Sequence, residues 1–196
     1  MNKGSKILVG LLLIAVGVVV GKFFFPSDSR TNLLPPVRYT NESAGTGDGS
    51  GADVAARVTG EIIEVKDGES IQKAVTKAKP GDLIRVYPGT YNETVYIDKD
   101  DISIQGVIEN GEWPTLDGQK QMNDAVLYSG NGFLIENFKI IKYKGNAIMG
   151  QAGNNYVIRN NWIIDTGVYG IFPQFGKNGL VAGNVLSEIE DAAIYV

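Results

Sequence analysis

The last third of this chain repeats itself at an interval of 23 residues. The triplet Ala147-Ile148-Met149 returns as Gly170-Ile171-Phe172 and again as Ala193-Ile194-Tyr195. A fixed period of about 20 to 50 residues indicates stacked structural units. Each period holds short β-rich runs divided by Gly, Asn and Asp, which is typical of a parallel β-helix whose strands pair with their copies one coil later. Two more apolar sets keep this interval: Ile135, Ile158 and Val181, and Ile140, Ile163 and Leu186.

The solenoid is expected to occupy residues 58–196. An amphipathic pattern over 70–79 predicts one short helix, which can cap the first coil. Residues 88–91 are expected to form a turn and 107–124 an extended loop. Apolar runs and alternation predict the first strands at 61–65, 83–87, 95–97 and 102–104.

An apolar stretch at the N-terminus predicts export. Lys3 and Lys6 precede 15 apolar or glycine residues, at 7–21. This arrangement is typical of an uncleaved signal-anchor or a cleaved signal peptide. Residues 1–26 are therefore expected to be one or the other. Either one places the rest of the chain outside the cytoplasmic membrane, as a single-pass membrane protein facing the periplasm or exterior, or as a secreted protein.

Residues 27–57 are expected to be a flexible linker, because much of this stretch is Gly, Ser, Thr and Asp.

The composition of the chain excludes several classes of functional site. The chain has no Cys and no His, which excludes disulfides, thiolate or imidazole metal sites and Ser-His triads. From Val58 onward there are 12 Lys and Arg against 18 Asp and Glu, a net charge of −6. Nucleic acid is thus not an expected partner.

Residues 70–91, 102–106 and 156–163 resemble the pectate-lyase-like superfamily of right-handed parallel β-helix proteins. The resemblance covers about 61–196 and implies an all-β, right-handed solenoid. It also implies a family of polysaccharide lyases, hydrolases, esterases and epimerases, adhesins and accessory proteins. The clustered aspartates of its galacturonan hydrolases and the Asp-Pro-His-Asp signature of its alginate epimerases are absent, so no catalytic residue is carried over. The chain ends inside a new coil, which suggests an N-terminal fragment of a longer protein.

One column of residues is expected to bind substrate. If Ile148 points inward, strand alternation turns Met149, Phe172 and Tyr195 outward. Such a stripe can stack against the sugar rings of a polysaccharide or surface glycan. The alternative is that a loop or the linker covers it.

Charged columns supply the candidates for catalysis. Asp165 and Glu188 would repel each other across the ladder. A Ca²⁺ ion, a shared lysine or splaying into water would each relieve this repulsion, and no other cofactor is expected. Glu136 and Arg159 are interpreted as a structural pair, and the stacked Asn137, Asn160, Asn161 and Asn184 as structural corners. The catalytic candidates are Lys142, Lys144, Arg159, Asp165 and Glu188.

The leading hypothesis is an exported, membrane-tethered β-helix that binds or processes a polysaccharide. If the protein is an enzyme, the expected reaction is a lyase or C5-epimerase step that begins with proton abstraction next to a carboxylate. The alternative is a non-catalytic adhesin or scaffold that binds protein. A third, weaker hypothesis is an accessory protein for cofactor or metal delivery at the membrane.

Overall fold

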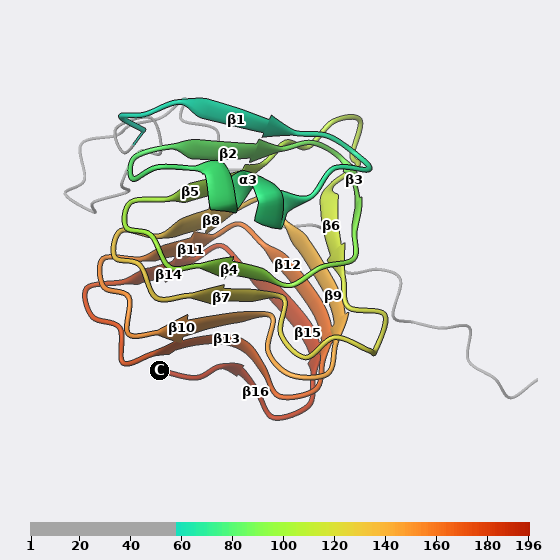
Figure 1. Cartoon of the computed structure of the whole chain (residues 1–196). Coiled ribbons are helices and arrows are strands. Elements are labelled where there is room, and N and C mark those ends of the chain that lie inside the picture. Colours follow the sequence, from blue (N-terminus) through green and yellow to red (C-terminus); the bar gives the residue numbers. More distant parts are fainter. Residues whose placement is uncertain (1–57) are drawn as a thin grey trace, which may run out of the picture. The chain divides into compact units, whose positions relative to one another are not determined.

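The computed structural model describes residues 58–196, which form a parallel β-solenoid of the right-handed type with one short helix (Figure 1). The expected anchor or signal peptide at 1–26 and the expected linker at 27–57 lie outside the described residues. Within the described part of the chain, no helix is both long and apolar enough to cross a membrane.

Three parallel sheets form the walls of the solenoid, and after the first strand and the helix each coil visits them in the order A, B, C. Sheet A contains β1 (Ile62–Val65), β2 (Leu83–Val86), β5 (Ser103–Gly106), β8 (Leu134–Glu136), β11 (Val157–Arg159) and β14 (Leu180–Ala182). Sheet B contains β3 (Gly89–Tyr91), β6 (Pro114–Asp117), β9 (Lys139–Tyr143), β12 (Trp162–Thr166) and β15 (Val185–Ile189). Sheet C contains β4 (Val95–Ile97), β7 (Val126–Tyr128), β10 (Ile148–Gln151), β13 (Tyr169–Gln174) and β16 (Ala192–Ile194).

The strand register confirms the 23-residue period. Ile148 pairs with Ile171, and Ile171 pairs with Ile194. The columns that contain Ile135 and Ile140 pair in the same way on sheets A and B. Residues one period apart are therefore lateral neighbours on adjacent strands.

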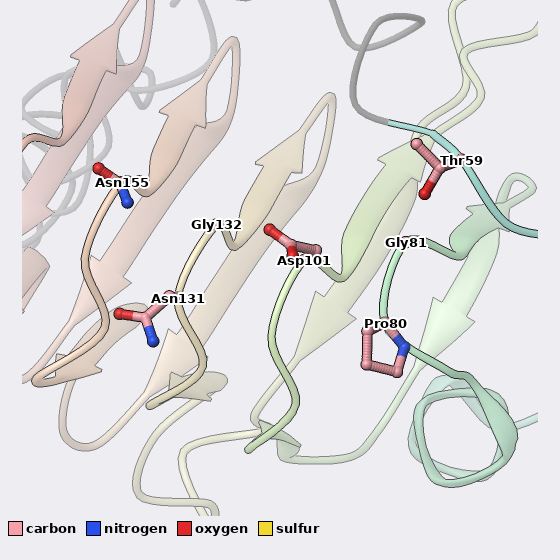
Figure 2. A pocket seen from close by; sticks show the side chains of 7 residues that line it. All are labelled: Thr59, Pro80, Gly81, Asp101, Asn131, Gly132 and Asn155. Atoms are coloured by element: carbon pink, nitrogen blue, oxygen red, sulfur yellow. The ribbon is translucent and has the colours of Figure 1, made fainter.

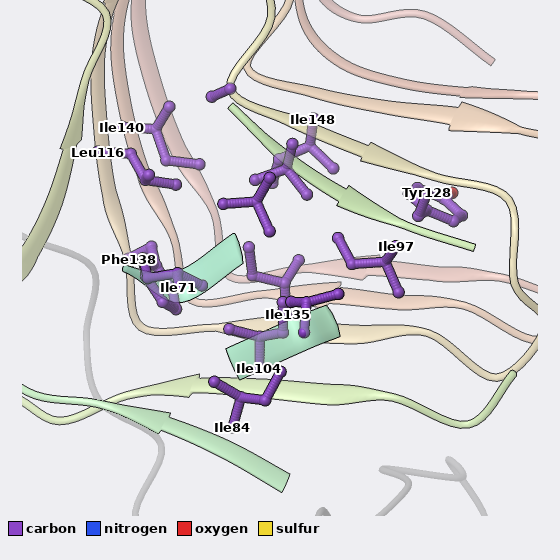
Figure 3. Packing of buried hydrophobic residues seen from close by; sticks show 14 of the residues in the cluster. Ile71, Ile84, Ile97, Ile104, Leu116, Tyr128, Ile135, Phe138, Ile140 and Ile148 are labelled. Carbon is purple, nitrogen blue, oxygen red and sulfur yellow. The ribbon is translucent and has the colours of Figure 1, made fainter. Parts of the chain in front are cut away.

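These columns form the core, because their side chains point into the solenoid from all three walls (Figure 3). Ile140, Ile148, Ile158 and Ile171 are each 0% exposed. Burying an aliphatic side chain of this size contributes about 1.5–3 kcal/mol. The gain is repeated in each coil whose column residues are buried, and it favours the non-local strand pairing between coils. In the last coil Ile194 is 44% exposed.

Two expected connections contain strands. The expected loop 107–124 contains β6, which pairs with β3 and β9 in sheet B. The expected turn 88–91 contains β3. Pairing with neighbouring coils stabilises both segments as strands, and it outweighs their local Pro and Gly content. Leu116 of β6 is 1% exposed and completes the apolar wall.

The helix α3 (Ile71–Lys77) is shorter than expected because the backbone turns extended at Ala78. Residues flanking β4 hold both of its ends. The Glu93 carboxylate accepts hydrogen bonds from the backbone N–H of Ile71 at 2.7 Å and of Gln72 at 3.1 Å. The Lys99 ammonium donates to three carbonyl oxygens at the other end, those of Val75, Thr76 and Ala78. An anion at the N-terminus and a cation at the C-terminus both complement the helix dipole.

Side-chain oxygens link successive coils at the corners. Between sheets A and B, Asn161 Oδ1 accepts from Phe138 N–H at 3.1 Å, and Asn184 Oδ1 accepts from Asn161 N–H at 3.0 Å. Beside this ladder, Asn137 and Asn160 adopt left-handed backbone with φ of 63° and 56°. The prediction that these asparagines are structural is confirmed.

The other two corners have ladders that the sequence analysis missed. Between sheets C and A, Asn131 Oδ1 accepts from Asn154 N–H, and Asn154 Oδ1 accepts from Lys177 N–H. Between sheets B and C, Asp124 accepts from Asn146 N–H, and Asn146 accepts from the N–H of Tyr169. Polar side chains thus satisfy backbone donors where the strands end.

Candidate functional site

The outer face of sheet C carries a continuous column of apolar and aromatic side chains. Tyr96 pairs with Leu127, Leu127 with Met149, and Met149 with Phe172. Tyr195 follows Ile194, the partner of Ile171, and so extends the column by one coil. The flanking positions on these strands point into the core. The predicted outward orientation of Met149, Phe172 and Tyr195 agrees with this register.

Aromatic rings gather at the C-terminal end of this column. The rings of Phe172 and Tyr195 meet edge to face, with centroids 5.1 Å apart. Tyr169 stacks on Tyr195 at 5.0 Å with an interplanar angle of 7°. The Tyr195 residue is 51% exposed, and Tyr169 and Phe172 are partly exposed. The three rings form an aromatic cluster that solvent can reach.

Uncharged polar groups flank the column. Gln151 and Gln174 are register partners two positions after Met149 and Phe172, so they lie on the same face. None of the five described strands of sheet C contains a charged residue. At the edge of the face, partial burial and the nearby Asp191 carboxylate raise the pKa of Tyr169. The face therefore offers rings and amides rather than charges.

The layer beneath this face is closely packed. Tyr128 is 0% exposed and stacks on Phe133 at a centroid distance of 4.5 Å. Burial, together with the neighbouring Tyr156, raises the pKa of Tyr128. A Cβ at Gly150 would lie 2.7 Å from the Tyr128 hydroxyl, so only glycine fits above that ring. The outer column rests on a filled interior and not on a cavity.

Three of the charged candidates form a column on sheet B. Lys142, Asp165 and Glu188 occupy equivalent positions in β9, β12 and β15, with φ of 57°, 63° and 56°. The ion pairs of this column are formed with residues outside it. Lys120 contacts the Asp165 carboxylate, and Lys142 Nζ lies 3.7 Å from the Asp117 carboxylate.

The remaining two candidates lie elsewhere. Arg159 is on sheet A, where its Nε donates to the Glu136 carboxylate at 2.6 Å. Gln105 donates to the same carboxylate at 2.7 Å, and Glu136 is only 4% exposed. This agrees with the interpretation of Glu136 and Arg159 as a structural pair. Lys144 lies at the corner that follows β9.

The five catalytic candidates therefore do not form a single constellation. Arg159 lies on a different sheet from Lys142, Asp165 and Glu188, and sheet C carries none of them. Within residues 58–196, no group of three or more acidic side chains is arranged to hold a metal ion. Asp165 and Glu188, the candidates for Ca²⁺, are thus not joined by a third acidic ligand.

A pair of tryptophans on sheet B is a feature that the sequence analysis missed. Trp113 and Trp162 meet edge to face at 6.2 Å, and Lys139 Nζ lies 4.7 Å from the centre of the Trp162 ring. Lys139 and Trp162 are register partners one period apart, so the 23-residue period could have indicated the Lys139–Trp162 contact, but not the contact with Trp113.

A groove of about 510 Å³ runs along the corner between sheets C and A (Figure 2). Its polar lining includes Asp101, Asn131 and Asn155. The backbone N–H groups of Asp101 and Asn155 already donate to carbonyl oxygens of the next coil. The groove has no basic or aromatic side chain among its lining residues. It is therefore a weaker candidate than the outer face of sheet C.

Comparison of the chain with protein-family models, with curated proteins and with solved structures finds no match. The fold and the surface together define the class: a parallel β-solenoid with an uncharged, partly aromatic sheet face open to solvent.

Proposed function

We propose that the solenoid binds an extended polysaccharide along the outer face of sheet C. One observation carries the proposal: the outward column runs over successive coils, from Tyr96 to Tyr195, on a sheet whose strands carry no charge. A linear polymer can contact such a column at several coils at once. Aromatic rings stack on the apolar faces of sugars. The side-chain amides of Gln151 and Gln174 can bond to sugar hydroxyls.

The chemistry of this face favours a neutral glycan. A uronate polymer would need cationic partners, whereas the sequence of residues 58–196 has a net charge of −6. The resemblance to pectate-lyase-like proteins supports carbohydrate as the ligand class, and the apolar stretch at 7–21 supports export. The protein would then hold glycan outside the cytoplasmic membrane, secreted or tethered by its N-terminal segment.

The test is a binding screen of the full-length chain against neutral and acidic oligosaccharides, followed by calorimetry. We expect Phe172→Ala and Tyr195→Ala each to weaken glycan binding about tenfold, which corresponds to about 1.4 kcal/mol of lost ring contact. Trp162→Ala, on sheet B, is the matched control and should bind as the parent does. The proposal fails if no glycan binds, or if Trp162→Ala is the variant that loses affinity.

Lyase or epimerase chemistry is tested in the same samples. Elimination from a uronate would produce an unsaturated sugar that absorbs in the ultraviolet, and epimerisation would change the sugar composition of the polymer. Because the five charged candidates are divided between faces, we expect binding without turnover. Product formation that is lost in Lys142→Ala or Asp165→Ala would instead establish the enzymatic hypothesis.

The second candidate function is a non-catalytic surface module that binds protein. The Trp113–Trp162 pair on sheet B favours it, because aromatic side chains are enriched at protein interfaces. In that case Trp162→Ala should weaken partner binding, whereas alanine at all five charged candidates should leave it unchanged. Glycan binding that depends on Phe172 would separate the two candidates.

A further inference from the structure

Each of the three sheets begins with a strand that has a neighbouring strand on one side only, namely β1 in sheet A, β3 in sheet B and β4 in sheet C. Side chains occupy the free edges of two of them. On β4, the Gln72 side chain from α3 accepts a hydrogen bond from Tyr96 N–H at 2.6 Å and donates to the Tyr96 carbonyl at 3.4 Å. On β3, the Asp67 carboxylate accepts from Thr90 N–H at 3.3 Å. These contacts take up backbone groups that a further strand could otherwise bind.

The free edge of β1 has no such partner among the described residues. β1 is the end strand of sheet A and pairs in parallel with β2 alone. The carbonyls of Glu61 and Val65 accept hydrogen bonds from backbone N–H groups at the two ends of β2. Successive residues of a strand direct their backbone groups to opposite edges, so those of Ile62 and Glu64 face away from β2. Figure 1 shows β1 at the end of the stack, with β2 and α3 on the same side of it.

The open edge also exposes an apolar side chain. Ile63 packs against the core, so alternation turns Ile62 to the outer side of sheet A. Leu134 and Val157 lie further along the same outward column and are 0% and 2% exposed, whereas Ile62 is 49% exposed. A strand added beside β1 would therefore cover apolar surface as well as pair with its backbone.

The charge around this edge is acidic. Residues 58–69 carry four exposed carboxylates, those of Glu61, Glu64, Asp67 and Glu69, against one ammonium group, that of Lys66. A second copy of the chain would bring the same carboxylates against each other, and like charges on paired strands are destabilising. A segment with basic side chains would complement them.

We propose that β1 is a docking edge for an extended segment of a partner protein, in which basic and apolar residues alternate. The segment adds to sheet A as a further strand, and its backbone bonds to Ile62 and Glu64 supply the affinity. Its basic side chains lie on the outer side beside Glu64, and their aliphatic stems cover Ile62. Its apolar side chains lie on the inner side beside Ile63. This inference does not depend on glycan binding, because it concerns the edge of a different sheet.

The test uses a short synthetic peptide of alternating lysine and valine, blocked at both ends and titrated by calorimetry into the full-length chain. A glutamate–valine peptide of the same length tests the contribution of charge. A fully N-methylated lysine–valine peptide tests backbone pairing, because it keeps the charge but has no N–H donor. Ile62→Pro removes an edge-facing N–H without breaking a bond to β2, a position at which proline is tolerated in edge strands. Ile62→Thr retains that N–H and is the matched control.

We expect the lysine–valine peptide to bind at one site per chain, and the other two peptides to bind at least about tenfold more weakly, because each lacks either the charge or the backbone donors. Ile62→Pro should weaken binding of the lysine–valine peptide by about the same factor, since a peptide carbonyl loses its donor. Ile62→Thr should bind as the parent does. Glu64→Lys is a second variant, which keeps every backbone group but reverses the charge, and it should also weaken binding.

Three results would overturn the proposal. The first is that the lysine–valine peptide does not bind to the parent chain. The second is that the N-methylated peptide binds equally well, or that Ile62→Pro and Glu64→Lys both bind as the parent does, since the attraction would then not involve this edge. The third is a dimer of the parent chain in sedimentation that Ile62→Pro dissociates, which would assign the edge to a second copy.

Discussion

Single side chains fix the start of the solenoid. Glu93 and Lys99 lie on either side of β4, and each bonds to several backbone groups of α3. A helix of seven residues has little stability of its own. These two residues therefore attach the helix to the first strand of sheet C and hold it over the end of the core.

Glu93→Gln should destabilise the fold by about 1–3 kcal/mol, because an amide cannot replace a carboxylate that accepts from several donors. Urea unfolding of the full chain followed by circular dichroism measures the loss. Glu190→Gln, an exposed position on the last coil, serves as the control. Equal midpoints for the two variants would contradict the role given to Glu93.

Asp82 gives the fold a defined acid sensitivity. Its carboxylate accepts from Lys79 N–H and Glu61 N–H, both at 2.8 Å. These bonds, the one from Lys79 first, hold the pKa of Asp82 below its ordinary value despite opposing burial. A lowered folded pKa means that the stabilisation is complete above the unfolded pKa of about 3.9 and is lost as pH falls through the folded value.

Asp82→Asn should therefore be less stable than the parent at pH 7, and the two proteins should converge in stability at acid pH. Urea midpoints measured from pH 7 to pH 2 test this expectation. A difference that stays constant over that range would show that ionisation of Asp82 has no part in stability.

At the scale of elements, the corners decide how coils stack. Asn161 is 0% exposed, and its side-chain nitrogen donates to Asn184 Oδ1 at 3.0 Å and to the Ile135 carbonyl at 3.4 Å. Together with its bond from Phe138 N–H, this side chain joins three successive coils. Asn154 occupies a corner ladder too, but it is partly exposed.

Asn161→Ala should cost about 2–3 kcal/mol, because it leaves buried backbone groups without partners. Asn154→Ala should cost less, since water can replace its bonds. The ratio of the two losses in urea unfolding is the measurement. A loss at Asn154 as large as that at Asn161 would show that burial does not set the strength of a ladder.

The sequence predicted those strands whose apolar residues recur at the 23-residue interval. Ile148, Ile171 and Ile194 are one period apart, and this spacing directly predicts that they pair on adjacent strands. It did not predict β3 and β6, because β3 is stabilised by pairing with β6, and β6 by pairing with β3 and β9, rather than by local propensity. The same limit applies to the Trp113–Trp162 contact, which joins a residue before β6 to one on β12.

The candidate site was predicted in part. Met149, Phe172 and Tyr195 followed from alternation, whereas Tyr169 and Tyr96 did not. Tyr169 reaches the cluster from the start of β13, and Tyr96 precedes the regular coils. The ion pairs of the charged column were not predictable from period alone, because Lys120 reaches Asp165 across a whole coil.

At the scale of the whole described solenoid, the three walls differ in character. Sheet A has a buried apolar column on its outer side, sheet B has tryptophans and ion pairs, and sheet C has an uncharged aromatic column. Stacking similar coils extends each kind of surface along the solenoid. Of the three walls, sheet C has the uncharged aromatic surface, and it is therefore the proposed face for an extended ligand.

Mapping of amide shifts by nuclear magnetic resonance, with a neutral oligosaccharide titrated into the full chain, tests this account most directly. A glycan bound along sheet C would contact several coils at once. Amides one period or more apart in the sequence should therefore shift together as the oligosaccharide is added. The amides expected to shift are those of Tyr96, Leu127, Met149, Phe172 and Tyr195. Shifts confined to one coil, or located on β8 and β11 of sheet A, would contradict it.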